Sequence, residues 1–210
     1  MIIKKLTVGA CHTNCYIISD EDKKHSAIID PGDNANDIMD IIKLNNFNVK
    51  YIIITHGHTD HILAVADVQT ATRAPIVINE IDAWRLEDEN LMNSRPYVKK
   101  PYKPVKASIL INDGAILPLG NLKLKFILIA GHTPGSTVIM VEDTIFTGDT
   151  LIEGICGRCD LPGGDITTLV RSFKILYELE GDYRIFPGHG GATTLDKERK
   201  TNEYMIKSML

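Results

Sequence analysis

The chain has 210 residues, of which 44% are hydrophobic and 24% charged, and its formal net charge at pH 7 is -4. These values are typical of a globular protein and exclude the disordered, collagen-like and disulfide-rich classes. We therefore expect one domain, residues 1–210, with a core large enough to fold without a structural metal. The lysines are scattered among acids and form no basic stripe, so nucleic acid is not an expected partner.

The beginning of the chain lacks the pattern of a secretory signal. Lys4 and Lys5 follow apolar residues, and no apolar run of the necessary length comes after them. No apolar stretch approaches the ~20 residues that span a bilayer. We therefore expect a cytoplasmic protein without a membrane partner, and the sequence gives no indication of its oligomeric state.

Apolar and β-branched runs alternate with helical patterns in the first half of the chain. The continuous apolar run 51–54 is typical of a strand buried on both faces, and Asp30-Pro31-Gly32 is a turn pattern. The predicted elements are, in order, strands at 2–8, 14–19 and 27–29, a helix at 34–47, a strand at 51–54, a helix at 62–71, a strand at 76–78 and a charged helix near 80–90.

A proline-rich segment, residues 91–106, then separates this half from a second one and is a candidate flap or rim of an active site. After it we predict strands at 108–112, 122–129, 137–142 and 144–147, a glycine-rich loop at 148–165, a helix at 168–179, a strand at 183–186 and a helix at 196–206. The order predicts two similar halves, packed sheet on sheet with helices outside.

The four cysteines are Cys11, Cys15, Cys156 and Cys159. The last two have the C-x-x-C spacing of a zinc half-site. The first two, however, lie four residues apart in a strand-like stretch, and reduced thiols are commonly small buried hydrophobes. We expect structural cysteines rather than a zinc site.

The densest group of metal-ligand candidates directly follows the strand at 51–54. His56, His58, Asp60 and His61 place three imidazoles and a carboxylate within six residues, and both group types bind zinc at about 2.0 to 2.2 Å. His56 and His58 point the same way from an extended segment, whereas the other two turn elsewhere, which fits two neighbouring metals better than one. Asp60 as an ordinary helix N-cap is the alternative, but it leaves three crowded histidines unexplained.

Three further segments each combine an apolar strand with a glycine-flanked ligand candidate, namely His132, Asp149 and His189. Strand ends are where a scaffold presents side chains to a shared edge. Each segment alone is weak evidence, since such residues are commonly structural, but together they complete the ligand set of the first cluster. The other histidines, His12 and His25, lack this setting and are predicted to be structural.

These segments resemble the metallo-β-lactamase superfamily through T-H-G-H-T-D-H at 55–61, G-H-T-P-G-S at 131–136, F-T-G-D-T at 146–150 and F-P-G-H-G at 186–190. The resemblance covers nearly the whole chain. Within the superfamily, residues 148–165 look most like the short glyoxalase-II-like branch, the hydroxyacylglutathione hydrolases. The resemblance implies an α/β fold, an αββα sandwich of two mixed sheets packed face to face with helices outside and metals at the sheet edge.

Carried over position by position, the resemblance implies two divalent ions, zinc first, with iron or manganese as alternatives. The first ion would take His56, His58 and His132, the second Asp60, His61 and His189, and Asp149 would bridge them. The β-lactamases proper usually lack an aspartate bridge at this position, which argues against antibiotic hydrolysis. Longer glyoxalase II enzymes bind glutathione with a C-terminal helical extension, and this chain ends soon after His189, so recognition of glutathione itself is in question.

The ligand set predicts a metal-dependent hydrolase. A hydroxide that bridges the ions would attack the carbonyl of a small-molecule thioester, with Asp149 bridging and Asp60 aiming the hydroxide, so both carboxylates are predicted to be catalytic. Arg158 and the rim Tyr97–Lys106 are candidates for holding an anionic thiol carrier. Arg158 would serve equally well as a cap of the glycine-rich loop, through its carbonyls or Asp160.

Two other activities stay open. Persulfide dioxygenases resemble this sequence too, including its C-G-R-x-D segment at 156–160, and bind a single Fe(II) that would here use His56, His132 and Asp149. The same site could also hydrolyse lactones or other esters. A module that keeps the metal without catalysis is the least favoured reading, because all seven ligand candidates are present.

Overall fold

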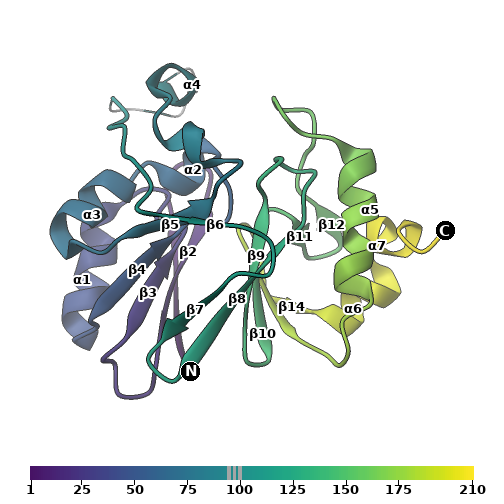
Figure 1. Ribbon diagram of the computed structural model, residues 1–210, viewed down its shortest axis with the longest axis horizontal. Coiled ribbons are helices and arrows are strands. Elements are labelled where there is room, and N and C mark those ends of the chain that lie inside the picture. Colours follow the sequence, from purple (N-terminus) through teal and green to yellow (C-terminus); the bar gives the residue numbers. More distant parts are fainter. Residues whose placement is uncertain (94–95, 97, 99–100) are drawn as a thin grey trace.

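The computed structural model describes residues 1–93, 96, 98 and 101–210, and its centre is a pair of mixed sheets (Figure 1). The first sheet has six strands in the order in which they occur in the chain: β1 (Ile2–Val8), β2 (Thr13–Ser19), β3 (Ser26–Ile29), β4 (Val49–Ile53), β5 (Ile76–Asn79) and β6 (Ile109–Ile111). Its first three strands are antiparallel, and the pairs from β3 to β6 are parallel.

The second sheet also has six strands, in the order β14, β13, β10, β9, β8, β7. All its pairs are antiparallel except β10 with β13. Its strands are β7 (Ile116–Leu119), β8 (Leu122–Leu128), β9 (Thr137–Val141), β10 (Thr144–Gly148), β13 (Arg184–Pro187) and β14 (Thr193–Thr194). A small separate hairpin is formed by β11 (Leu151–Ile152) and β12 (Ile155–Cys156).

Helices cover the outer face of each sheet (Figure 1). On the first sheet lie α1 (Ala35–Asn45) and α3 (Val65–Thr72), and on the second lie α5 (Ile166–Tyr177), α6 (Leu195–Thr201) and α7 (Glu203–Lys207). The shorter helices are α2 (Thr59–Ile62), the 3-10 helix η1 (Ala83–Leu86) and α4 (Glu89–Asn93). No helix in the described part of the chain is long and apolar enough to cross a membrane.

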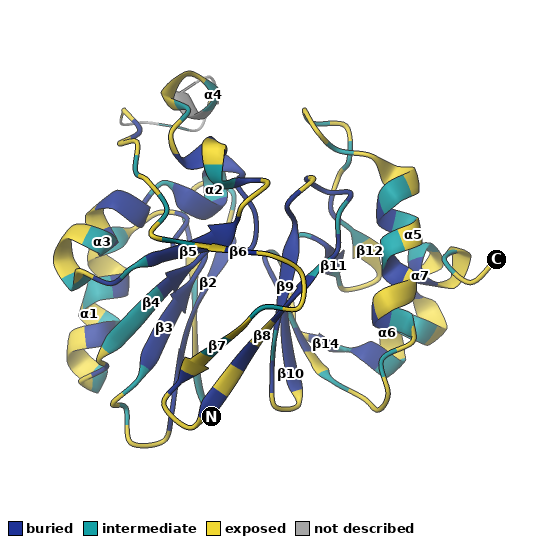
Figure 2. Ribbon diagram, in the orientation of Figure 1, coloured by how far each residue is buried: buried dark blue, intermediate teal, exposed yellow. Residues whose placement is uncertain are grey.

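Buried apolar side chains form three layers. The middle layer lies between the two sheets and includes Ile18, Phe126 and Phe146, all fully buried. The outer layers lie between each sheet and its helices, around Ile52 on one side and Phe173 on the other. Figure 2 shows the same arrangement, with strands largely buried and helices exposed on their outer faces. The predicted αββα sandwich is thus confirmed.

Several local predictions were wrong for identifiable reasons. The charged segment 80–90 is not one helix but η1 followed by α4. β7 was missed because Pro118 interrupts its apolar pattern, which is tolerated on an edge strand. The final helix is divided at Asn202, whose side chain accepts hydrogen bonds from the first backbone N–H groups of α7 and so begins a new helix.

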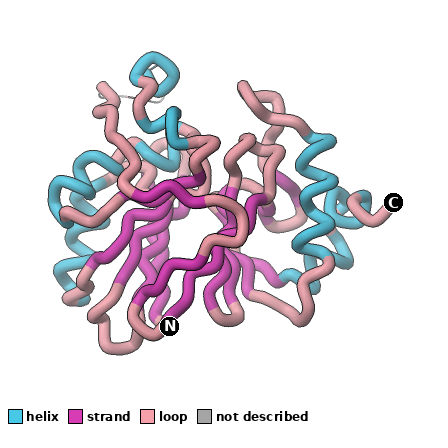
Figure 3. The backbone as a smooth tube through the Cα atoms, viewed as in Figure 1, coloured by secondary structure: helices cyan, strands magenta, loops and turns pink. Residues whose placement is uncertain are grey.

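The loops that carry the candidate ligands lie at one edge of both sheets. In Figure 3 the longer loops rise from the upper edge, whereas short turns connect strands at the lower one. β4, β10 and β13 all end at this upper edge, one to three residues before His56, Asp149 and His189. The fold therefore gathers strand ends that are far apart in sequence.

Candidate metal centre

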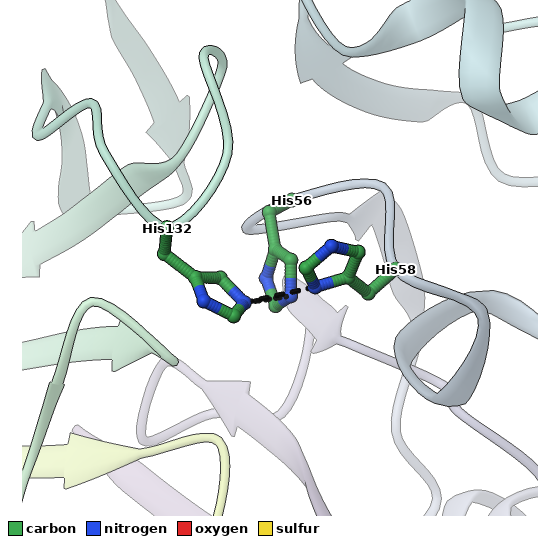
Figure 4. Close-up of side chains that lie close together, drawn as sticks. All are labelled: His56, His58 and His132. Carbon is green, nitrogen blue, oxygen red and sulfur yellow. Dashed lines mark hydrogen bonds between the residues drawn. The ribbon is translucent and has the colours of Figure 1, made fainter. Parts of the chain in front are cut away.

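His56, His58 and His132 form a group that we call the imidazole cluster. The first two follow β4 and the third follows β8, so the group joins the two sheets. His132 Nε2 lies 3.1 Å from His56 Nε2 and 2.9 Å from His58 Nδ1. Figure 4 shows the three rings converging on one point. All three are buried.

Oxygen atoms on the outer side of these rings determine which nitrogen carries the proton. His132 Nδ1 lies 2.7 Å from the backbone oxygen of Arg158, which can only accept, so this nitrogen donates. His56 Nδ1 lies 3.0 Å from Thr55 Oγ1. The Thr55 hydroxyl donates its own proton to the Asp30 carboxylate at 2.6 Å, so it accepts from His56 Nδ1. In neutral rings, the inner nitrogens of His132 and His56 then carry lone pairs that face each other.

Asp60, His61 and His189 form a second group, which we call the mixed cluster. Their ligand atoms all lie within 4.8 Å of one another. His189 Nε2 is 3.2 Å from Asp60 Oδ2, and His61 Nε2 is 3.6 Å from the same oxygen. The hydroxyl of Thr13 on β2 donates to that oxygen at 3.0 Å.

Asp149, at the end of β10, lies between the two clusters. Its Oδ1 is 3.4 Å from His61 Nε2, and its Oδ2 is 3.7 Å from His132 Nε2 and 3.4 Å from His189 Nε2. One carboxylate thus faces both groups. The structure brings together all seven of the ligand candidates selected from the sequence.

The environment separates the pKa values of the two clusters. Burial, and then the neighbouring His132, lower the pKa of His58 to about 3. Burial acts in the same direction on His189, but hydrogen bonds to Asp149 and Asp60 outweigh it and raise its pKa to about 9. For His61 the three surrounding carboxylates likewise overcome burial and raise the pKa. The imidazole cluster is therefore neutral at pH 7, and the mixed cluster holds protons between its carboxylates.

The donor set fits divalent metal ions. Among the described residues, the buried atoms His58 Nε2, His61 Nε2 and Asp149 Oδ1 have no hydrogen-bond partner. Buried polar atoms are costly without partners, and the last two of these atoms point into the space shared by the ligands. Nitrogen and carboxylate oxygen are ligands for zinc, iron and manganese alike. The site is a histidine and aspartate metal site of the type expected for a dinuclear centre.

Asp30 is a residue of the site that the sequence analysis missed. It is buried, and its Oδ2 accepts from Thr55 Oγ1 and lies 2.9 Å from His61 Nδ1, so it orients one ring of each cluster. Its sequence pattern, Asp30-Pro31-Gly32, predicts only a turn. Its only local signal is an acidic residue at the end of a buried strand, and its role depends on the pairing of that strand with the one that precedes the histidines.

The helix N-cap alternative for Asp60 was wrong. α2 begins at Thr59, its N-cap residue is His58, and the structure shows no side-chain hydrogen bond to its first turn. Asp60 instead turns toward His189 and Thr13.

A cavity of about 370 Å³ opens onto the two clusters, and Arg158 lines it together with Cys11, Pro96 and Leu161. The Arg158 guanidinium forms a two-pronged ion pair with Asp160, with contacts of 2.6 and 2.7 Å. The predicted alternative role of Arg158, a bond to Asp160, is therefore present, and its position on the cavity wall is compatible with substrate binding as well.

Two residues of the proposed rim, Tyr102 and Lys103, contact other parts of the protein and not this cavity. Tyr97 lies outside the described residues. Tyr102 is buried and donates to the backbone oxygen of Leu86 at 3.0 Å, and Lys103 pairs with Asp67 at 2.6 Å. Neither of these two is among the residues that line the cavity.

The cysteines and the remaining histidines lie outside both clusters. The groups of potential metal ligands found in the described part of the chain contain no cysteine. His25 pairs with Asp20 at 2.7 Å, and His12 is exposed in the turn before β2.

Comparison with known proteins agrees with this geometry. Residues 8–189 match the family model of the Metallo-beta-lactamase superfamily. The chain belongs to that superfamily. It is 32% identical to hydroxyacylglutathione hydrolase GloC of Haemophilus influenzae, over 98% of each chain. The family and the site together identify a metal-dependent hydrolase of this fold.

Two solved structures resemble the whole fold. One is the BLEG-1 B3 metallo-beta-lactamase, with a TM-score of 0.89 and 31% identity over 97% of this chain and 99% of that one. The other is TTHA1623 in a di-iron-bound form, with a TM-score of 0.86 and 29% identity over 96% of this chain and 99% of that one.

Proposed function

We propose that this hydrolase cleaves thioesters of the hydroxyacylglutathione type with two divalent metal ions. The observation that carries the proposal is the position of Asp149, whose carboxylate faces both clusters: its Oδ2 lies 3.7 Å from His132 and 3.4 Å from His189, and its Oδ1 lies 3.4 Å from His61. A carboxylate in that position would bridge two ions. The similarity to a hydrolase named for this substrate class supports the choice of thioester.

The imidazole cluster would hold one ion, the mixed cluster the other, and Asp149 both. Two bound ions would supply a hydroxide at neutral pH and polarise the substrate carbonyl. Asp60 is suited to orienting a water in the cavity, because hydrogen bonds and nearby histidines keep its pKa low despite burial, and it lines the cavity. Thr13 donates to Asp60 Oδ2 and thereby fixes the carboxylate plane.

The complete mixed cluster favours hydrolysis over persulfide oxidation. A mononuclear iron site of the dioxygenase type would use His56, His132 and Asp149 as ligands. The three residues of the mixed cluster, Asp60, His61 and His189, would then bind no metal. These three residues are brought within 4.8 Å of one another. We propose zinc as the metal, with iron next, since a relative of 29% identity is described in a di-iron-bound form.

The test combines metal content with substrate class. Protein purified without oxygen is analysed for bound metals and assayed with S-lactoylglutathione, a simple acyl thioester and an aliphatic lactone. We expect about two ions per chain and thioester cleavage that exceeds lactone cleavage. One iron per chain, with oxygen uptake on glutathione persulfide, would overturn the proposal in favour of a persulfide dioxygenase. Lactone cleavage faster than thioester cleavage would indicate a lactone hydrolase.

A second candidate function is β-lactam hydrolysis, which the similarity to the BLEG-1 B3 metallo-beta-lactamase favours. The chromogenic cephalosporin nitrocefin, assayed beside S-lactoylglutathione on the same metal-loaded protein, separates the two. We expect kcat/KM to be larger for the thioester, and the reverse order would assign the chain to antibiotic hydrolysis.

A further inference from the structure

Asp82 is a fully buried carboxylate that the proposed reaction does not use. It lies between β5 and η1, in a segment that the sequence suggested to be an ordinary charged helix. Burial of a carboxylate is costly unless several donors satisfy it. The identity of its donors therefore shows what the residue does.

The donors of Asp82 come from the two loops that form the imidazole cluster. Gly57 N, between His56 and His58, donates to Oδ2 at 2.9 Å. Thr133 Oγ1 donates to the same oxygen at 2.7 Å, and Gly135 N donates to Oδ1 at 3.0 Å. These last two residues lie one and three positions after His132. One carboxylate thus ties together the only loops that supply this cluster's three rings.

The loops approach Arg85 and Asp82 so closely that two glycines are required. A Cβ at Gly57 would lie 2.5 Å from Arg85 Cδ, and one at Gly135 would lie 2.8 Å from Asp82 Cβ. Both distances are too short for any side chain. Gly57, between two of the histidines, and Gly135, three residues after the third, therefore serve this junction.

Arg85 extends the junction to a third loop. It is 97% buried, and its Nη2 donates to the backbone oxygen of Pro162 at 2.8 Å. Its Nε lies 3.6 Å from Asp82 Oδ1 and has no hydrogen-bond partner among the described residues. The loop that contains Pro162 also supplies the Arg158 oxygen that fixes His132.

We infer that Asp82, supported by Arg85, is a positioning residue that holds the loops of His56, His58 and His132 at the spacing needed to bind a metal ion. The inference rests on the proposed metal centre. Outer partners of metal ligands typically contribute about 10- to 100-fold to metal affinity. Loss of Asp82 is expected to weaken the imidazole cluster by that factor and to leave the mixed cluster nearly unchanged.

The test uses Co²⁺ as the probe, because its visible absorption reports ligand geometry while competition with a chromogenic chelator reports affinity. We compare the wild type with Asp82→Ala and Asp82→Asn. The amide retains one acceptor but turns an NH₂ group toward one of the two glycine N–H groups. We expect about 10- to 100-fold weaker binding and an altered spectrum for Asp82→Ala, a smaller change for Asp82→Asn, and one tight Co²⁺ retained by each.

Glu198 on α6 provides a matched control. It is also fully buried and accepts three hydrogen bonds, from Thr193 Oγ1, Gly154 N and Asn202 Nδ2. Its donors do not belong to the loops of the imidazole cluster. Glu198→Ala should destabilise the metal-free protein about as much as Asp82→Ala, yet retain both Co²⁺ affinities and the wild-type spectrum.

The outcomes separate the inference from the proposed function. If the wild type binds no Co²⁺, the metal centre itself fails. If it binds and Asp82→Ala keeps its affinity within about twofold, only the positioning role is wrong. If Asp82→Ala does not fold, the Co²⁺ affinities of Thr133→Val and Thr133→Ser are compared, because only the first substitution removes the hydroxyl that Asp82 accepts from. Equal Co²⁺ affinities would overturn the inference. Weaker Co²⁺ binding by Thr133→Val alone would support it.

Discussion

The imidazole cluster and the mixed cluster share Asp149 but differ in burial and charge. His58 and His132 are 7% and 2% exposed, whereas His189 is 26% exposed and carries a raised pKa. In the first group, desolvation and neighbouring rings keep the nitrogens unprotonated. In the second, carboxylates retain protons that a cation must displace. One cluster therefore offers unprotonated nitrogens to a metal ion, whereas the other must first release protons.

The largest expected effect is at the residue that the two clusters share. Asp149→Ala should reduce thioester hydrolysis by about a thousandfold or more, because the contribution of a dinuclear centre is several kcal/mol. The chain should stay folded, since Asp149 lies at a strand end. The control is Asp143→Ala, an exposed carboxylate before the same strand that pairs with Arg184. Near-wild-type turnover by metal-loaded Asp149→Ala would contradict a bridging role.

The exposure difference predicts unequal release of the two ions. A chelator should remove zinc from the wild type in two phases, the faster from the mixed cluster, with rates that differ by roughly tenfold, or about 1.4 kcal/mol of barrier. His189→Ala should lose the fast phase and His58→Ala the slow one. Stopped-flow measurement with a chromogenic chelator tests this. If the zinc ions that remain in His189→Ala and His58→Ala are released at equal rates, the two clusters do not differ in metal release.

The opposite pKa shifts predict a stability maximum near neutral pH for the metal-free protein. The pKa of His58 falls to about 3 on folding, so the unfolded chain binds more protons and stability decreases as pH falls below about 6.5. The pKa of His189 rises to about 9, so its contribution is present below about 6.5 and is lost as pH rises through 9.

Urea unfolding of chelator-treated protein from pH 5 to pH 10 measures both limbs. His58→Asn should flatten the acid limb, by on the order of 1–2 kcal/mol at pH 5, and His189→Asn the alkaline limb. Asp60 and Asp149 do not contribute between pH 6.5 and 5, because their lowered pKa values delay protonation until more acidic pH. An acid limb unchanged by His58→Asn would show that burial does not hold this ring neutral.

The layered fold and the convergence of the seven ligand candidates could be predicted, because strand periodicity and a glycine-flanked ligand after each strand are local patterns. Asp30 and Asp82 could not. The role of Asp30 depends on the parallel pairing of β3 with β4, which places its carboxylate beside Thr55. Asp82 accepts a hydrogen bond from Thr133, which lies 51 residues later in the sequence. Such carboxylates are recognised only when the loops they join are placed in space.

The smallest expected effect concerns Arg158, for which the sequence left two roles open. Its ion pair with Asp160 is exposed, so breaking it should change the free energy of unfolding little. If the guanidinium also holds an anionic thiol carrier, Arg158→Ala should raise KM for a carboxylated thioester about three- to fivefold with kcat unchanged, and leave KM for a neutral thioester as it was.

Asp160→Ala is the complementary variant, because it frees the guanidinium while retaining its charge. For a role in substrate binding, it should lower KM for the carboxylated thioester and so move opposite to Arg158→Ala. For a role as a loop cap, the two variants should act alike on both substrates, since each breaks the same pair and disturbs the segment whose backbone oxygen fixes His132. The sign of the Asp160→Ala effect therefore decides whether the cavity wall selects its substrate by charge.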